Sequence, residues 1–355
     1  MIRSVHDGFL DTLMAVSSQP TRLALNVDLD APGKHVGDLM LRWSDNSNPL
    51  GYHPIPVISL KGSDGPTVLI TGGNHGDEYE GPAAMMRMAN TLDPATLTGQ
   101  VILMPALNAP AFTASSRVSP LDGANLNRAF PGDSNGSATA MIADFVGQAL
   151  LPRCDGAIDL HSGGKASFFA PCALATQSQN PELRAANLAL AQAFGLPLIW
   201  ELGAQNDNRS LNSAADRVGV PMIATELGGG GGVDPDITNA TELGLRNCLA
   251  FLGVTGTPPT LIDARRVELV SPKHTLFAPG AGVFDRAVSA GQDVEAGDVA
   301  GHFHFVMEPE RESLTCRFPT DGFVLAHTCR GYVQRGELLA LVAQDVVPAP
   351  NEERT

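Results

Sequence analysis

Short apolar runs alternate with alanine-rich segments between residues 66 and 252, and this alternation limits the possible folds more than any other feature. The runs have the length and composition of strands buried on both faces, and the segments between them have helical patterns. The predicted strands are 66–73, 100–105, 155–161 and 221–226, and the predicted helices are 81–90, 138–151, 181–194 and 237–252. The sequence therefore predicts a layered α/β domain with a largely parallel sheet.

The 355-residue chain is strongly acidic, with 23 Lys and Arg against 38 Asp and Glu and a net charge of −15. A surface of this sign repels phosphate, which argues against nucleic-acid binding and against a polybasic membrane anchor. We also find no apolar stretch long enough to span a bilayer and no signal-peptide pattern. Five scattered cysteines without a Cys-x-x-Cys pair indicate buried, reduced thiols in a cytoplasmic protein. A homo-oligomer is compatible with all of this.

The sequence pattern changes from helical segments to short alternating runs after a linker rich in proline and glycine at 253–259. Residues 265–345 alternate in short runs between glycine turns, which predicts a small all-β domain. We therefore divide the chain into an α/β domain at 1–255, which begins with a β extension, and a β domain at 260–345.

The β domain contains a weak internal repeat whose halves begin at Gly282 and Gly322. The repeat resembles the flattened half-barrel of lipoyl and biotinyl carrier domains, which carry their cofactor on a lysine. The one lysine after residue 165 is Lys273, which lies outside the repeat. We expect a structural domain without a carrier function, which shapes the mouth of a site or an oligomer contact.

Three of the predicted strands are followed by, or end in, an unusual polar residue. His75 and Glu78 follow the first strand, and His161 and Glu226 end two others. Ligands of open α/β sheets bind outside the carboxyl ends of the strands, so these side chains should converge. Two histidines and one carboxylate are typical of a catalytic zinc site with a fourth position open for water. The sequence predicts one Zn²⁺ per chain, with Glu226 free to act as general base and then general acid.

Further residues are candidates for substrate contact. Adjacent Asn127 and Arg128 can clamp a carboxylate, and Arg117 could reach a developing oxyanion. Arg209 lies in a polar loop and could also contact substrate. Asp159 could orient a ligand histidine or be an ordinary acid at the core edge. Taken alone, each pattern has a structural explanation as well, because a lone His-x-x-Glu is usually a solvated turn and a loop arginine a surface charge.

Four motifs together resemble those of a known family: His75-x-x-Glu78, Asn125-Leu-Asn-Arg-Ala-Phe-Pro-Gly132, Asp159-Leu-His161 and Glu226. Their order and spacing are similar to those of the aspartoacylase/succinylglutamate desuccinylase family, a branch of the zinc carboxypeptidase-like hydrolases. The resemblance covers roughly residues 55–345. It implies a three-layer α/β/α sandwich on a mixed, largely parallel sheet, with a small C-terminal all-β domain.

The resemblance also implies roles for individual residues. The two histidines and Glu78 would bind zinc, and Glu226 would activate water. Asn127 and Arg128 would hold a substrate carboxylate, and Arg117 would stabilise the oxyanion, although the loop around Arg117 matches most loosely.

The implied reaction is hydrolysis of the amide of a small N-acyl amino acid. The runs at 73–82, 159–164 and 226–231 resemble the branch of the family that deacetylates Nα-acetyl-L-2,4-diaminobutyrate in ectoine degradation. The alternatives are desuccinylation or deacylation of another N-acyl amino acid, and a metallocarboxypeptidase. A β domain docked over the site would favour a small amide, and an open groove would favour a peptide. A non-catalytic binding protein would be expected to lack a metal ligand or Glu226, and all four residues are present.

Overall fold

The computed structural model describes residues 22–46, 48–203, 206–256, 258–259 and 261–347. Residues 1–21, the start of the expected first domain, lie outside the described residues. The strands of the larger, α/β part of the molecule are β1 Leu23–Leu25, β2 Gly33–Leu41, β3 His53–Lys61, β4 Ser63–Gly72, β5 Thr98–Met104, β6 Gly156–His161, β7 Ser167–Phe169, β8 Cys172–Thr176, β9 Leu198–Leu202, β10 Met222–Glu226 and β11 Arg265–Glu268.

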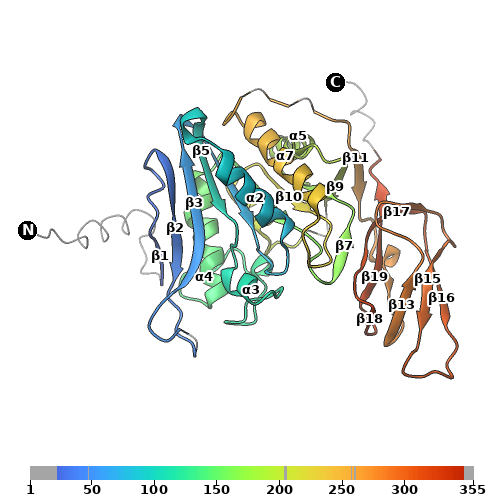
Figure 1. Ribbon diagram of the computed structural model, residues 1–355. Helices are drawn as coiled ribbons and strands as arrows, with labels where there is room; N and C mark the ends of the chain where they lie inside the picture. The colour runs from blue at the N-terminus through green and yellow to red at the C-terminus, as the bar shows by residue number, and fades with distance from the viewer. Residues whose placement is uncertain (1–21, 47, 204–205, 257, 260, 348–355) are drawn as a thin grey trace, which may run out of the picture.

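These strands, apart from β7, form a mixed sheet in the order β1-β2-β3-β5-β4-β6-β10-β8-β9-β11 (Figure 1). The central strands β5, β4, β6 and β10 run parallel, while β8 is antiparallel to β10. The first three strands form an antiparallel extension that pairs with β5 through β3. The mixed sheet predicted for the family is therefore confirmed, and the extension accounts for the β pattern before the first buried strand.

Helices cover both faces of this sheet (Figure 1). The α-helices are α2 Glu80–Thr91, α3 Ala109–Thr113, α4 Ala138–Phe145, α5 Pro181–Phe194, α6 Leu211–Val218 and α7 Pro235–Phe251. The short helices are η1 Pro94–Thr96, η2 Leu126–Arg128, η3 Val146–Leu150, η4 Leu151–Arg153 and η5 Pro272–His274. The helix predicted at 138–151 changes type after Phe145 and ends at Arg153, since Pro152 lacks the N–H group that a continuing α-helix needs.

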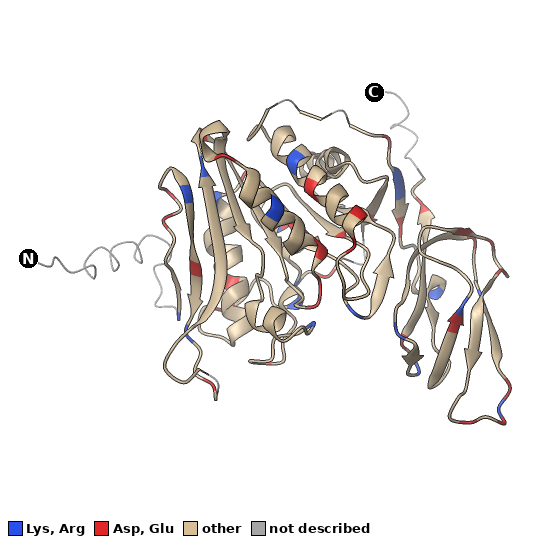
Figure 2. Cartoon of the chain, in the orientation of Figure 1, with Lys and Arg blue, Asp and Glu red and all other residues tan. Residues whose placement is uncertain are grey.

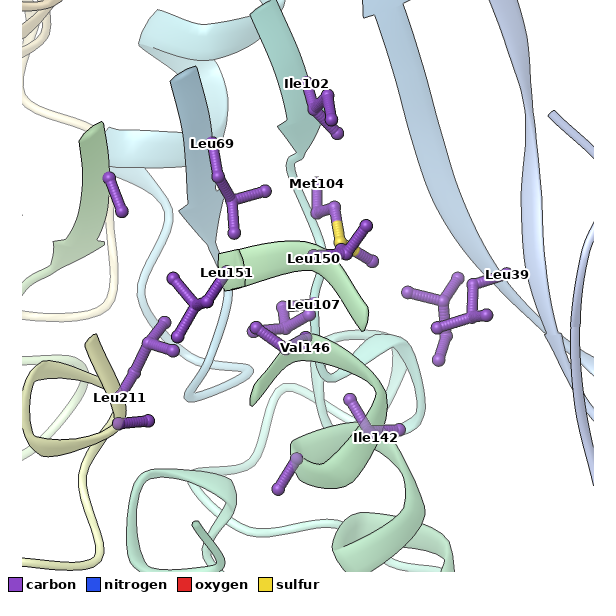
Figure 3. Packing of buried hydrophobic residues seen from close by; sticks show 14 of the residues in the cluster. Leu39, Leu69, Ile102, Met104, Leu107, Ile142, Val146, Leu150, Leu151 and Leu211 are labelled. Carbon is purple, nitrogen blue, oxygen red and sulfur yellow. The ribbon is translucent and has the colours of Figure 1, made fainter. Parts of the chain in front are cut away.

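The alternation of side chains along β4 explains the three layers. Val68 and Ile70 pack into the core beneath α2, α5 and α7. Leu69 points to the opposite face and packs into the core with residues of α4 and α6, such as Ile142 and Leu211 (Figure 3). Successive side chains of a strand lie on opposite faces, so a strand that is apolar throughout needs two cores. This is the physical basis of the confirmed α/β/α sandwich.

The C-terminal part is built from short strands. They are β12 Leu276–Phe277, β13 Gly282–Arg286, β14 Asp293–Val294, β15 Val299–His304, β16 Leu314–Arg317, β17 Gly322–Thr328, β18 Tyr332–Val333 and β19 Leu338–Asp345. The two halves of the sequence repeat exchange their shortest strands, because β14 pairs with β17 and β18 pairs with β13. A separate four-stranded sheet, β16-β15-β13-β18, closes this small β unit.

The β unit is joined to the large sheet at two places. Strand β11 pairs with β9 on one side and with β19 on the other, which makes the sheet continuous. Strand β7, which follows the loop after His161, pairs with β17 of the β unit. The β unit is therefore docked beside the loops at the carboxyl ends of the central strands.

The cysteines differ in part from expectation. All five are free, and Cys154, Cys172 and Cys248 are buried, but Cys316 is half-buried and Cys329 is exposed. The prediction of five buried thiols is therefore wrong for these two, which lie on the edge strand β16 and in the turn after β17.

Basic and acidic residues are interspersed over both units (Figure 2). Among the described residues, no helix is both long and apolar enough to cross a membrane.

Candidate active site

Three adjacent strands of the central sheet position the site. His161 is the last residue of β6 and Glu226 the last residue of β10, and the two are direct partners in the parallel ladder. His75 and Glu78 lie in the loop that connects β4, the other neighbour of β6, to α2. Parallel strands end at the same edge of a sheet, so the three segments converge there as the sequence predicted.

The two histidines and Glu78 form a compact buried group. Nδ1 of His75 lies 2.7 Å from Oε1 of Glu78, and Nδ1 of His161 lies 2.9 Å from Oε2 of the same carboxylate. One potential ligand atom from each residue lies within 4.8 Å of the other two, and all three side chains are buried. Each imidazole thus directs the same ring nitrogen to one common point.

The outer nitrogens of both rings are held by oxygen atoms. Nε2 of His161 lies 2.8 Å from Oδ2 of Asp159, and Nε2 of His75 lies 3.2 Å from Oδ1 of Asn125. A carboxylate and an amide oxygen only accept, so each Nε2 carries the proton and donates it. The two inner Nδ1 atoms are then available as ligands, an arrangement that outer carboxylate and amide partners commonly impose on metal-binding histidines.

The negative carboxylate and the two inward-facing nitrogen atoms of this group need a positive charge between them. Two nitrogen lone pairs and a carboxylate that face one another at these distances are stable only with protons or a metal ion between them. Burial raises the pKa of Glu78, but without a metal the charge interactions and hydrogen bonds with His75 and His161 outweigh burial and hold that pKa well below the ordinary value. A divalent ion supplies the same two positive charges as two protons. Two imidazole nitrogens and a carboxylate oxygen also make the donor set of catalytic zinc sites, so the residues fit this metal.

Asp159 contacts the outer ring nitrogen of His161. Burial raises the pKa of this carboxyl, but its contacts with His161 and its hydrogen bonds outweigh burial and lower the pKa below its usual range. The hydrogen bonds come from Thr71 Oγ1 at 2.7 Å and Asn74 Nδ2 at 3.0 Å. Of the two explanations left open by the sequence, the structure thus supports a positioning role. Sequence reasoning gave no role to Asn74 and Asn125, although each lies next to or within a motif that carries a ligand or clamp residue.

Glu226 lies beside the group without joining it. The residue is half-buried, and its Oε2 atom is buried without a hydrogen-bond partner among the described residues. Burial, reinforced by the negative charge of Glu78, raises the pKa of Glu226 to about 8. A carboxyl group with a free oxygen and a pKa near neutrality has the properties of a general base and acid.

Arg117 approaches the group from the loop between α3 and η2. Its Nη1 donates to Nδ1 of His75 at 3.3 Å and lies 3.6 Å from Oε1 of Glu78. The side chain is about half exposed, so it reaches the buried group from the cavity side. A guanidinium at this place can donate to an oxygen that becomes negative next to the three potential ligands.

Asn127 and Arg128 lie in η2 on another wall of the site. Oδ1 of Asn127 accepts from the backbone N–H of Leu211 at 3.0 Å, which ties this side chain to the first turn of α6. Nε of Arg128 lies 3.0 Å from Oδ2 of Asp207. Arg209 forms a bidentate pair with the same carboxylate, and its side chain is 60% exposed.

A cavity of about 380 Å³ connects these residues. Its polar end contains His75, His161, Arg117, Asn127, Arg128 and Glu226. The remaining wall includes Phe169 of β7, Trp200 of β9 and Leu269, which follows β11. Arg209 is not among the lining residues, so its role in substrate binding stays a prediction. A cavity of this size suits a small molecule.

The layered sheet and the buried His–Glu–His group at its strand ends, which fits a metal ion, are typical of hydrolases of the α/β/α class. Residues 64–252 match the succinylglutamate desuccinylase/aspartoacylase catalytic domain, and the chain belongs to this family. It is 35% identical, over 92% of its length and 96% of the relative's, to N-alpha-acetyl-L-2,4-diaminobutyric acid deacetylase of Halomonas elongata.

Solved structures agree with this assignment. The product-bound ectoine utilization protein EutE (DoeB) of Ruegeria pomeroyi has a TM-score of 0.88 and 34% identity, and the match covers 92% of this chain and 99% of that one. A succinylglutamate desuccinylase/aspartoacylase of Rhodobacter sphaeroides has a TM-score of 0.86 and 35% identity, with 92% and 100% coverage.

Proposed function

We propose that this protein is a zinc-dependent deacetylase that hydrolyses the acetyl amide of Nα-acetyl-L-2,4-diaminobutyrate. One observation supports the reaction type: Glu226, whose Oε2 atom has no hydrogen-bond partner among the described residues, lies beside the buried group of His75, Glu78 and His161 at one end of a cavity. The names of the Halomonas and Ruegeria relatives support the substrate. The free cysteines support a reducing compartment, and we place the reaction in the cytoplasm.

Each residue of the polar end has a part in the proposed reaction. His75, Glu78 and His161 would hold the zinc ion, which would supply polarisation of an acyl carbonyl and lower the pKa of a water molecule to about 7. Glu226 takes a proton from the attacking water and returns it to the nitrogen of the leaving amine. The net reaction adds water across the carbon–nitrogen bond and yields acetate and 2,4-diaminobutyrate.

Two arginines would stabilise negative charges of the substrate, one on the acyl oxygen and one on the α-carboxylate. Arg117 donates to the acyl oxygen as negative charge develops on it. Arg128 and Asn127 bind the α-carboxylate of the substrate, and the ion pair of Arg128 with Asp207 fixes the direction of the guanidinium.

The size of the cavity, about 380 Å³, supports a small amide over a peptide. Phe169 belongs to β7, which is fixed to the β unit by pairing with β17, and Leu269 lies where the two units join. A metallocarboxypeptidase would need an open groove for the rest of its peptide.

The test is a turnover screen of the zinc-loaded protein. Nα-acetyl-2,4-diaminobutyrate, N-acetylaspartate, succinylglutamate and a blocked dipeptide are compared at equal concentration, each with a chelated control. We expect chelator-sensitive turnover with preference for the diaminobutyrate amide. Preference for another acyl amino acid would contradict the proposed substrate and leave the proposed reaction type intact. If the metal-loaded protein turned over none of the four compounds, both the substrate and the reaction type would be contradicted.

A further inference from the structure

A row of apolar side chains leads from the catalytic end of the cavity along the sheet. Ala224 of β10, Leu174 of β8 and Trp200 of β9 are partners in adjacent ladders and lie side by side across three strands. All three line the cavity. Ala224 lies two residues before Glu226, and therefore on the same face of β10 as the proposed general base. The row thus begins beside Glu226 and ends at an indole ring.

An amino acid held by its carboxylate must direct its side chain along one of the cavity walls. With the carboxylate at Arg128 and the acyl group at the metal ligands, the row is the apolar wall that remains. Two methylenes of a diaminobutyrate side chain match an apolar wall, but the ammonium at its end needs a partner of opposite character.

The carboxylates near the cavity do not provide this partner. Besides Glu226, the acidic residue among the described lining residues is Asp207. One of its oxygens is bonded to both Arg128 and Arg209, and the other accepts from the backbone N–H and Nε of Arg209. Asp207 is therefore already neutralised by two arginines.

Trp200 offers a different kind of partner. Its ring lies nearly parallel to that of Phe169, with an interplanar angle of 16° and centroids 6.4 Å apart, and both residues line the cavity. Trp200 also lines a second pocket together with Glu268, so a further carboxylate lies in its neighbourhood. The face of an indole attracts a cation within about 6 Å, most strongly where water is excluded.

We propose that Trp200 determines specificity through a cation–π contact between its ring and the side-chain ammonium of the substrate, while Ala224 and Leu174 contact the methylenes. This inference rests on the proposed function and names how the same site selects a cationic side chain. It predicts discrimination between substrates of nearly equal shape, one with a cationic and one with an apolar end to its side chain.

The experiment compares two amides of nearly equal shape: Nα-acetyl-2,4-diaminobutyrate and Nα-acetylnorvaline, in which a methyl group replaces the ammonium. We expect Trp200→Leu to lower kcat/KM for the charged amide by about 10-fold and for the norvaline amide by less than about 3-fold. Trp200→Phe keeps an aromatic face and should retain most of the preference for the charged amide. Turnover of the norvaline amide also reports whether each variant is folded.

If Trp200→Leu lost the same factor of kcat/KM on both amides, its preference would be unchanged, as expected if Asp207 recognises the ammonium. That result would contradict the role of Trp200 and leave the proposed function intact. If the variant is inactive on both amides, Trp200→Phe decides, because a loss of preference there contradicts the inference. A wild-type protein that hydrolyses neither amide would overturn the proposed function and this inference with it.

Discussion

Glu226 and His161 face each other as direct partners in the parallel ladder between β10 and β6. One residue belongs to the buried group that fits a metal ion, and the other is the carboxylate with an unpartnered oxygen. Backbone hydrogen bonds between two central strands thus set the separation of the proposed metal ligand and the proposed general base. Neither position depends on a flexible loop, which fits the demand of catalysis for fixed geometry.

Replacing the proposed base should abolish turnover without removing the metal. We expect Glu226→Gln to lower kcat by about 10²–10⁴-fold, because glutamine keeps the shape but cannot accept a proton from water. Steady-state kinetics and the zinc content of the purified variant measure the two effects separately. Glu182→Gln, on the exposed first turn of α5, is the matched control and should be fully active. Wild-type activity in Glu226→Gln would rule out the mechanism.

The raised pKa of Glu226 predicts the pH dependence of the reaction. The base acts in its ionised form, so kcat/KM should fall as pH decreases through its pKa. Burial sets that pKa at about 8 without a metal, and the positive charge of a bound ion moves it down toward the ordinary 4.5. We therefore expect the acidic limb of the kcat/KM profile between these two values. A profile that stays flat down to pH 4.5 would contradict this assignment.

Asp159 should matter for metal affinity through His161. We expect Asp159→Asn to weaken zinc binding by about 10–100-fold, since the histidine loses the charged partner of its outer nitrogen. Competition with a chromophoric chelator measures the affinity. Asp155→Asn is a suitable control, because Asp155 lies just before β6 and its carboxylate accepts from the backbone N–H of Thr67 at 2.8 Å, away from His161. Equal affinities in the two variants would refute the positioning role.

Substitution of Arg128 should affect substrate binding more than chemistry. Lysine keeps the charge but lacks the planar fork that holds a carboxylate, so we expect Arg128→Lys to raise KM by about 10-fold or more with a smaller change in kcat. Arg153→Lys alters an arginine of comparable exposure that pairs with Asp30 and does not line the cavity. It should leave both constants unchanged. A change in kcat alone for Arg128→Lys would argue against the clamp.

Asp122 provides a test of stability as a function of pH. Its carboxylate accepts from the backbone N–H and the hydroxyl of Thr139 in the first turn of α4, at 2.7 and 2.8 Å. Burial raises the pKa of Asp122, but these and further hydrogen bonds outweigh it and lower the pKa below the ordinary 3.8. The ionised form is therefore favoured in the folded state. Its contribution is present in full above the ordinary pKa and is lost as pH falls through the lowered value.

We accordingly expect Asp122→Asn to reduce the free energy of unfolding by about 1 kcal/mol near neutral pH. The difference from the wild type should shrink below pH 3.8. Urea denaturation at both pH values measures it, and a difference that grows in acid would show that the sign is wrong.

Much of the fold could be predicted from the sequence because the relevant signals are local. The apolar run at 66–73 requires burial on both faces wherever it lies, and Pro181 and the alanines after it mark a helix that begins and ends as predicted. The repeat from Gly282 and Gly322 likewise indicated two related halves. That these halves exchange β14 and β18 depends on pairing between distant strands, which no local pattern encodes.

The identities of the site residues were equally present in the sequence. His75, Glu78, His161 and Glu226 each follow or end a buried strand, and the carboxyl ends of such strands meet at one edge. The roles of Asn125 and Trp200 were not accessible in this way. Asn125 acts through a contact with a histidine 50 positions away, and Trp200 through its place beside Leu174 in the ladder.

The sequence by itself determined the layers, the ligand types and the chemistry that the family shares, because periodicity and donor chemistry are properties of short segments. Only the tertiary structure decided which nitrogen of each histidine faces inward, which arginines line the cavity and how β7 is held beside it. Those outcomes depend on strand order, register and the docking of β7 on β17, which are set by packing between segments far apart in the chain.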